Sequence, residues 1–323
     1  MKNWFARLLG GAPPTEADRP APATAASLPQ GDPATPAGFD LDLAFHRWLA
    51  GPAVHVGESK DALIQGELAR LARDPQAAAG LVPRVPAVIP QLLRSLREEG
   101  TSARELARQV AQDVTLVAEV IREVNSPYYR PATPVRTIEG ALMLLGQNGL
   151  RMLLARVAFR PVISAQPGRL ARQAAPRLWR QSEKCALAAS LAAPRYGADP
   201  FEACLAGLTR NVGLVVALRL IDQLDSAGRL PQSDSFACSL RDSARILSSR
   251  IATQWELPPP VGAAILQAGE AGGLPLAQAL RMGERLATLR VLCEAGVEGA
   301  QDAVAGLAED ERRIFDKLGG MDA

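Results

Sequence analysis

Side chains that could bind a metal ion or activate a nucleophile are scarce in this chain of 323 residues. It has two histidines, His46 and His55, and both precede the long helical part of the sequence. A binuclear hydrolytic centre needs several histidines or carboxylates that converge on one point. We therefore expect no metal site, no cofactor and no catalytic residue of that kind.

The four cysteines offer no alternative chemistry, because their spacing matches no zinc or redox motif. They are Cys185, Cys204, Cys238 and Cys293. We interpret them as free, buried or half-buried thiols of a protein from a reducing compartment.

Binding of an anion is a second chemistry that the residue types suggest. Nine basic residues and one acid lie between residues 147 and 198, a local net charge of +8 against +2 for the whole chain. Arg177, Arg180 and Lys184 are spaced i, i+3 and i+7, which places them on one helix face. Two interpretations stay open: a solvated face paired with acids near residues 309–311, or a surface for an acidic partner or a phosphate-bearing ligand.

Nucleic acid is the least favoured anionic partner. Aromatic residues that could stack on bases are few in the basic segment, where only Phe159, Trp179 and Tyr196 occur. The net charge of +2 gives no global attraction either. We expect no nucleic-acid binding.

The composition favours helices as the elements that position these side chains. Aromatic residues make up 4% of the chain, whereas alanine and leucine are abundant, which favours helix over strand. Residues 1–38 are rich in Pro, Ala, Gly and Thr, so we expect a disordered segment and linker there. Residues 39–80 are predicted to form a short helical extension.

The body of the chain is predicted to be all-α, in two helical subdomains over about residues 81–166 and 175–275, with C-terminal helices over 276–323 packed on them. A joint is expected at Pro167–Gly168 and Pro176. Helix starts are predicted from the capping residues Asp40, Asp113, Thr137 and Asp199, and from a capping box at Ser102 and Glu105. Helices are predicted over 59–73, about 88–99, 114–124, 138–145, 148–163, 177–193, 200–224, 236–256, 261–270, 275–294 and 310–318.

No apolar run reaches the roughly 20 residues that a bilayer-spanning helix needs. Residues 4–9 have a short apolar face, but Arg7 interrupts it, and it is too short for the core of a signal peptide. A cytoplasmic location is therefore expected.

Several short motifs, taken in their order and spacing, resemble one known family. They begin with Leu81-Val82-Pro83-Arg84-Val85-Pro86 and end with Trp255-Glu256-Leu257-Pro258, so that about residues 81–275 resemble the HDOD domain, the HD-related output domain of bacterial signalling proteins. The signature positions are Pro86, Asp113, Asn125, Ser126, Gly146, Trp179, Gly207, Gly213 and Trp255. We interpret them mainly as packing, capping and turn residues. The resemblance implies an all-α fold related to the HD superfamily of phosphohydrolases.

The chain departs from that superfamily at each place where a metal ligand is frequent. Arg210-Asn211 stands at the position of the metal-binding His-Asp pair, and arginine has no lone pair to offer a cation. The other departures are Gln181, Ala244, Ala268 and Gly269. The resemblance therefore implies a degenerate member without the metal ligands.

Two functions follow from these observations. The first is a non-catalytic bacterial signal-transduction module that binds a signalling protein or senses a small, phosphate-bearing ligand. It would act in trans, since no receiver, cyclase or DNA-binding segment is evident. The second is an altered HD-type metal-dependent phosphohydrolase that uses other carboxylates as ligands. The available carboxylates are Asp199, Glu202, Asp222, Asp225 and Asp242.

Overall fold

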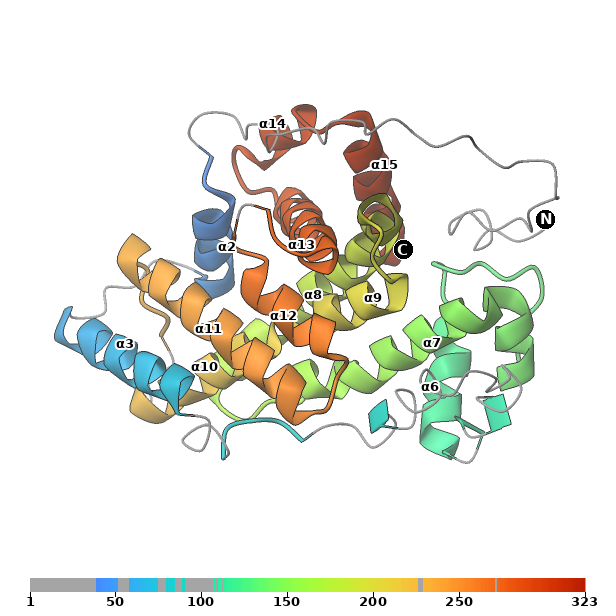
Figure 1. Ribbon diagram of the computed structural model, residues 1–323, viewed down its shortest axis with the longest axis horizontal. Coiled ribbons are helices and arrows are strands. Elements are labelled where there is room, and N and C mark those ends of the chain that lie inside the picture. The colour runs from blue at the N-terminus through green and yellow to red at the C-terminus, as the bar shows by residue number, and fades with distance from the viewer. Residues whose placement is uncertain are drawn as a thin grey trace.

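The computed structural model describes residues 39–51, 58–74, 80–84, 89–90, 107–108, 110–111, 113–225, 229–270 and 272–322. Every regular element in these ranges is a helix, which confirms the predicted all-α class (Figure 1). The expectations for residues 1–38, for the helix over about 88–99 and for the capping box at Ser102 and Glu105 lie outside the described residues. His55 and Pro86 also lie outside them.

From α7 onward the helices follow one another along the chain with short connections. They are α2 (Leu41–Ala50), α3 (Glu58–Arg73), α6 (Val114–Val124), α7 (Ile138–Ser164), α8 (Arg169–Tyr196), α9 (Pro200–Thr209), α10 (Val212–Leu224), α11 (Asp234–Gln254), α12 (Pro259–Gln267), α13 (Pro275–Glu294), α14 (Ala300–Ala305) and α15 (Glu309–Leu318), with a final 3-10 turn at Gly319–Asp322.

Four of the predicted helix caps are present. The carboxylates of Asp40, Asp113 and Asp199 and the hydroxyl of Thr137 accept hydrogen bonds from backbone N–H groups in the first turns of α2, α6, α9 and α7. These N–H groups have no partner inside the helix, so a side-chain oxygen in this place stabilises the start of each helix.

Helix α7 confirms the prediction of two helical segments over 138–145 and 148–163. It is continuous except at Gly146, where φ is 71° and ψ is 177°. A left-handed φ of this kind is tolerated by glycine at little cost. Gly146 therefore turns one helix into two segments that meet at a kink.

The predicted joint at Pro176 is wrong, because Pro176 lies inside α8. The helix begins at Arg169, directly after Gly168, and its first turn is capped from a distance. The Asp222 carboxylate, on α10, accepts hydrogen bonds from the backbone N–H groups of Leu170 (2.8 Å) and Ala171 (2.9 Å). This tertiary cap lets the helix start seven residues before a proline that would by itself suggest a boundary.

The predicted helix over 200–224 is interrupted at Arg210–Asn211, between α9 and α10. By length and composition this segment could cross a membrane, since an 18-residue window in it has a mean hydropathy of 1.6, but 89% of that window is buried inside the molecule. Among the described helices it alone passes that test, and its burial is that of a core helix.

Helix α8 lies at the centre of the packing, between α9 on one side and α13 on another (Figure 1). Glycines allow these helices to approach closely. A Cβ atom on Gly207 of α9 would lie 2.5 Å from Cα of Ala186, and one on Gly283 of α13 would lie 2.6 Å from the backbone N of Ala189. Both distances are far below van der Waals contact, so only glycine fits.

One hydrophobic core runs through both predicted subdomains. It joins side chains from α2 and α3, such as Leu49 and Leu68, to others on α6 to α13. A second cluster joins α8 and α13 to α14 and α15, with Leu286, Phe315 and Leu318 buried in it. The helices before residue 81 and after residue 275 thus pack directly on the body.

Candidate functional site

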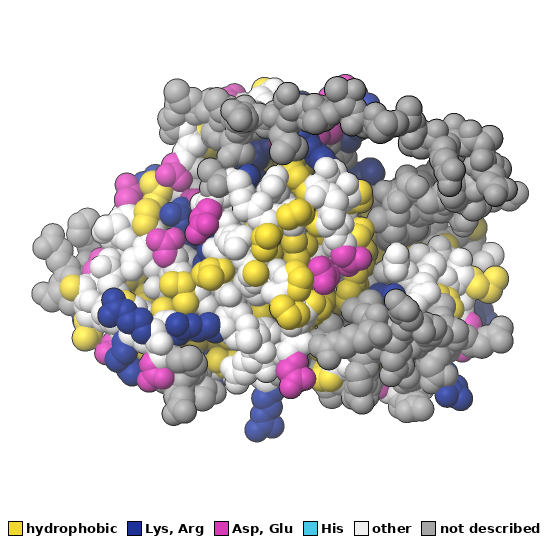
Figure 2. Space-filling model, in the orientation of Figure 1, with side chains coloured by type: hydrophobic (Ala, Val, Ile, Leu, Met, Phe, Trp, Pro, Cys, Tyr) yellow, Lys and Arg dark blue, Asp and Glu magenta, His cyan; other side chains and the backbone are white. Residues whose placement is uncertain are grey.

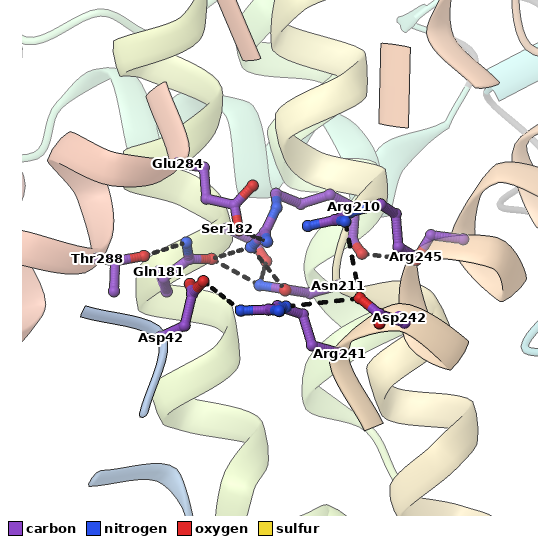
Figure 3. A network of polar contacts seen from close by, with 11 residues as sticks. Asp42, Gln181, Ser182, Arg210, Asn211, Arg241, Asp242, Arg245, Glu284 and Thr288 are labelled. Carbon is purple, nitrogen blue, oxygen red and sulfur yellow. Dashed lines mark hydrogen bonds and ion pairs between the residues drawn. The ribbon is translucent and has the colours of Figure 1, made fainter. Parts of the chain in front are cut away.

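The positions singled out for their lost metal ligands converge in the folded chain. Arg210 and Asn211 lie at the break between α9 and α10, Ala244 on α11 and Ala268 at the end of α12, and all four line one pocket. Gln181 of α8 joins them through hydrogen bonds to Asn211 and Arg210. Residues far apart in sequence therefore form one site (Figure 3).

Three buried polar side chains form the floor of this site. The Asn211 amide Nδ2 donates to Oε1 of Gln181 (2.6 Å) and to Oγ of Ser182 (2.8 Å). The Gln181 Nε2 atom donates in turn to Oγ1 of Thr288 on α13 (3.1 Å). All of these side chains are buried, so the hydrogen bonds are needed to offset desolvation of the amides.

The guanidinium group of Arg210 lies on this floor. Its Nη1 atom donates to Oδ1 of Asn211 (3.0 Å) and to Oε1 of Gln181 (3.3 Å). Its Nη2 atom forms an ion pair with Glu284 of α13. Both charged side chains are mostly buried, at 15% and 17% exposure. The site thus holds a fixed cation that belongs to the chain.

Ser248 of α11 holds the helix break in place. Its hydroxyl donates to the backbone oxygen of Arg210 (2.5 Å) and accepts from the backbone N of Gly213 (2.8 Å). Gly213 also has no room for a side chain, because a Cβ atom would collide with the backbone oxygen of Ala244. The break that points Arg210 inward is therefore built by α11.

The residues at this site do not fit a divalent metal ion. The amide oxygens of Gln181 and Asn211 already accept hydrogen bonds, and Glu284 neutralises Arg210. Ala244 and Ala268 offer no donor atom. A metal would also lie beside a guanidinium that cannot lose its proton.

A cavity of about 80 Å³ opens above Arg210 and Asn211, between α2, α10, α11, α12 and α13. This volume exceeds the roughly 10–15 Å³ that one water molecule needs. Arg241 and Arg245, one turn apart on α11, line it beside Arg210 (Figure 3). Most of its remaining wall is aliphatic, from residues such as Leu240 and Leu280.

The two arginines of α11 have few protein partners. Nη1 of Arg241 forms an ion pair with Asp42 of α2, while its Nε lies 3.7 Å from Asp242. Nη1 of Arg245 lies 3.9 Å from the same carboxylate, beyond hydrogen-bond distance. The Asp242 side chain is 61% exposed, so solvent weakens both of its ion pairs.

Helix α2 covers the cavity and is fastened at several points. The ring of His46 donates from Nε2 to the backbone oxygen of Pro231 (2.8 Å), and Arg47 pairs with Asp234 (3.0 Å). Arg177 of α8 donates to the backbone oxygen of Leu49 (3.1 Å), and its guanidinium lies over the ring of Trp48. Desolvation by burial lowers the pKa of His46 below its usual 6.5, so the ring is neutral at pH 7.

The prediction that Arg177, Arg180 and Lys184 form one exposed face is wrong. Lys184 is only 1% exposed, and its Nζ donates to the backbone oxygen of Leu318 (2.9 Å) and pairs with Glu294 (3.2 Å). Arg177 is half-buried against α2, and Arg180 is exposed. The reason is that α13 and α15 pack on α8 at Lys184, whereas α2 packs on it at Arg177.

Acids from other elements compensate much of the charge of the basic segment. Arg156 pairs with Glu123 of α6 and Glu183 of α8, and Arg195 pairs with Asp310 of α15. One of the two interpretations left open above was that the basic residues pair with acids near residues 309–311. It is confirmed for Arg195, which pairs with Asp310. The local charge of +8 is a property of the sequence segment and not of one surface.

The carboxylates proposed for an altered metal site do not meet. Asp199 caps α9, Asp222 caps α8, and Asp225 pairs with Lys60 (3.5 Å). Glu202 lies in the first turn of α9, and Asp242 lies beside the two arginines of α11. Among the described residues, no three His, Cys, Asp or Glu side chains are grouped to hold a metal ion.

The signature positions that the structure describes have packing, capping or turn roles. Asn125 closes the turn after α6, since its amide donates to the backbone oxygens of Ile121 and Val135 and accepts from the N–H of Val135. Trp179 and Trp255 are buried in the core. The remaining positions are Asp113, Ser126, Gly146, Gly207 and Gly213, at a cap, a turn, a kink and two tight helix contacts.

The cysteines are free, as expected, although Cys238 is exposed. Burial raises the pKa of both Cys185 and Cys204 to about 12, so these thiols stay protonated.

The sequence analysis did not single out two arginines that line the cavity. Arg241 and Arg245 lie three residues before and one residue after Ala244. The available signal was the i, i+4 spacing of Arg241 and Arg245, which places both on one helix face.

Comparison with known proteins places this site in context. The sequence profile of one protein family, described as the HDOD domain, matches residues 82–270. No curated protein matches the chain. The matched range includes α6 to α12 and excludes α2, α3 and α13 to α15.

Three solved structures are similar in fold. An HDOD domain protein with unknown function from Geobacter sulfurreducens is 23% identical, over 79% of this chain and 94% of that one, with a TM-score of 0.56. A candidate metal-dependent phosphohydrolase from Shewanella amazonensis SB2B is 16% identical, over 82% and 100%, with a TM-score of 0.57. A candidate signal transduction protein from Marinobacter aquaeolei VT8 is 18% identical, over 85% and 69%, with a TM-score of 0.52. At these identities the likeness shows the fold alone.

Proposed function

The chain belongs to the HDOD domain family, and on that premise we propose that it is a non-catalytic signal-transduction module, which acts by binding a protein partner or a small ligand. The observation that carries the proposal is the Arg210 guanidinium, held by Glu284, Asn211 and Gln181 where a related hydrolase would hold its metal. The site therefore holds a positive charge that belongs to the protein itself.

The energetic argument concerns Glu284. A metal ion that recruited this carboxylate would take it away from Arg210 and leave the guanidinium largely buried and unpaired. Breaking a buried ion pair in this way typically costs about 3–5 kcal/mol. The two amides would also have to give up hydrogen bonds that they make to each other and to Arg210. A metal-dependent reaction at this point is therefore disfavoured by the residues themselves.

The similar structures support both classes of function to different degrees. The protein from Marinobacter aquaeolei VT8 is described as a candidate signal transduction protein, which agrees with the proposal. The protein from Shewanella amazonensis SB2B is described as a candidate metal-dependent phosphohydrolase, which keeps hydrolysis as the alternative to be tested.

The test measures metal content and hydrolysis on the full-length chain. The purified protein is incubated with Mn²⁺, Fe²⁺ or Mg²⁺, and then analysed for bound metal and for release of p-nitrophenol from bis-p-nitrophenyl phosphate. We expect no stoichiometric metal and no metal-stimulated release. Hydrolysis that depends on added metal and disappears in Glu284→Gln and Asn211→Ala would establish the altered phosphohydrolase instead.

A positive test addresses the binding role. Wild-type protein and Asn211→Leu, which removes the floor of the site, are used to capture partners from the native cell. We expect a partner or a small molecule to be retained by the wild type and reduced with Asn211→Leu. Arg313→Gln, at an exposed position of α15, serves as a matched control that should retain it fully.

A further inference from the structure

Three arginines line the cavity beneath α2, and only one of them has a buried carboxylate as its partner. Arg210 is committed to Glu284, and the Asp40 carboxylate is committed to capping α2. Arg241 and Arg245 remain, and their two carboxylate neighbours are largely exposed: Asp42 pairs with Arg241, and Asp242 lies 3.7 Å from Arg241 and 3.9 Å from Arg245. Nε of Arg241 is buried and has no hydrogen-bond partner among the described residues.

Asp42 differs from the other acids because it arrives on a separate element. Helix α2 lies outside the range that matches the HDOD family, whereas Arg210, Arg241 and Arg245 lie inside it. The Asp42 carboxylate is 52% exposed, so its ion pair with Arg241 exchanges readily with solvent. Asp42 therefore places a removable anion on Arg241, one turn from Arg245.

We propose that this cavity binds a small organic phosphate, whose phosphate group replaces the Asp42 carboxylate at Arg241 and Arg245 and thereby releases the N-terminal end of α2. This inference rests on the proposed function, since it names the ligand class and the moving element of the non-catalytic site. Two guanidinium groups one turn apart present several N–H donors to one oxyanion, the arrangement that arginine provides for phosphate.

The shape of the cavity favours a phosphate that carries an apolar group. The cavity is also lined by apolar side chains that offer no hydrogen bond to a polar ligand: Leu43, Phe45, Leu214, Ile265 and Leu280. Pockets for small molecules commonly combine such an apolar wall with a few charged groups that fix orientation. The ligand therefore has an anionic head and an apolar body.

The coupling between ligand and α2 follows from charge balance. If α2 left without a replacement anion, Arg241 would lose its ion pair while still half-buried. If the phosphate entered while Asp42 stayed, two anions would share the same guanidinium. Exchange of one anion for the other avoids both costs, so ligand binding and the docking of the N-terminal end of α2 exclude each other.

The binding experiment uses the full-length chain with phenyl phosphate as the probe, and inorganic phosphate and benzoate for comparison, in titration calorimetry at low salt. We expect phenyl phosphate to bind more tightly than inorganic phosphate. Arg245→Gln, which leaves the contacts of α2 intact, should weaken binding at least about tenfold, whereas the exposed control Arg313→Gln should not change it. Equal binding of benzoate and phenyl phosphate would change the assigned anion from phosphate to carboxylate and overturn the ligand class.

Asp42→Asn separates the exchange model from simple binding at a positive surface. Without the competing carboxylate, the affinity for phenyl phosphate should rise about fivefold. Hydrogen exchange should speed up in residues 41–45 when the probe is added and slow down in residues 241–245. Unchanged or weaker binding by Asp42→Asn, or slower exchange in α2, would overturn the proposal.

Phenyl phosphate also distinguishes failure of the phosphate site from failure of the proposed function. Phenol release from phenyl phosphate in the presence of Mn²⁺ would contradict the non-catalytic role itself. Absence of binding together with absence of phenol release would remove only the phosphate site and leave that role standing.

Discussion

The role of a basic side chain in this protein depends on whether it is buried or exposed. Lys184 and Arg180 belong to the same basic segment of α8, one turn apart. Lys184 is enclosed by α13 and α15 and bonds to Leu318 and Glu294, whereas Arg180 faces solvent. Identical charge thus has a structural role at one position and a surface role at the other.

Charge reversal at these two positions should have opposite consequences. Lys184→Glu places a carboxylate beside Glu294 in the interior, so we expect a loss of more than about 3 kcal/mol in unfolding free energy. Arg180→Glu should change it by no more than about 0.5 kcal/mol. Denaturant unfolding of both variants measures the difference, and a Lys184→Glu protein as stable as Arg180→Glu would contradict the buried position.

His46 should make stability depend on pH. Burial lowers its pKa, so at this ring the folded protein binds fewer protons than the unfolded chain. The contribution of His46 to the free energy of unfolding is therefore complete above pH 6.5. It is lost as the pH falls from there through the pKa of His46 in the folded state. The positive charge of Arg47 also lowers the pKa of His46, and the negative charge of Asp234 raises it by less than Arg47 lowers it.

The variant His46→Gln keeps an N–H donor for Pro231 but does not titrate. Between pH 7.5 and 5 we expect wild-type stability to fall more than that of His46→Gln in denaturant unfolding. Buried carboxyls such as Glu183, whose pKa is raised mainly by desolvation, act in the opposite sense and are present in both proteins. Parallel pH profiles would show that His46 is not the titrating group.

At the scale of elements, backbone contacts between helices set the spacing of the site. Helix α8 carries Gln181 and Ser182, and α9 leads directly into Arg210. The close approach of α8 and α9 at Gly207 and Ala186 therefore decides whether Asn211 can reach Gln181. The polar floor depends on a packing contact that carries no functional group.

Gly207→Ala tests this dependence, with Gly66→Ala as its matched control. The new methyl group at residue 207 would lie 2.5 Å from Cα of Ala186, so we expect a loss of about 1–3 kcal/mol or more. Gly66 lies on α3 with no atom within 4 Å, and alanine there should stabilise the protein by about 0.5–1 kcal/mol. Thermal unfolding of both variants should move in opposite directions, and stabilisation by both would refute the tight contact.

At the scale of the whole molecule, the HDOD domain is enclosed by elements from outside the matched range. Helices α2 and α13 lie beside α8 and α11 (Figure 1). Both line the cavity, and α13 provides Glu284 and Thr288 to the site. The yellow side chains in Figure 2 show apolar atoms across the centre of one face, between charged groups. The site is therefore shared between the family domain and the additions of this chain.

Two truncations test which additions belong to the folded unit. A chain that starts at residue 39 should unfold cooperatively with the stability of the full chain, because the described core begins at Leu49. A chain that starts at residue 52 loses Leu49 from the core and the bonds of His46 and Arg47. It should lose several kcal/mol, given about 1.5–3 kcal/mol for each fully buried large side chain. Calorimetry that found both truncations equally stable would show that α2 contributes nothing to the fold.

The sequence alone determined the helical class, the caps at Asp40, Asp113, Thr137 and Asp199, and the family. These follow from local rules, since capping and apolar periodicity act over a few neighbouring residues. It also identified Gln181, Arg210, Asn211, Ala244 and Ala268 as one set, through motif order along the chain.

Only the tertiary structure decided what these residues do together. The Arg210–Glu284 pair, the Asp222 cap on α8 and the burial of Lys184 all join residues more than fifty positions apart. Such contacts depend on which helix faces meet, and charge periodicity cannot tell a face turned to solvent from one covered by a later helix. For this reason the sequence singled out residues that the fold brings together, whereas packing alone revealed the arginine-lined cavity and the helix that covers it.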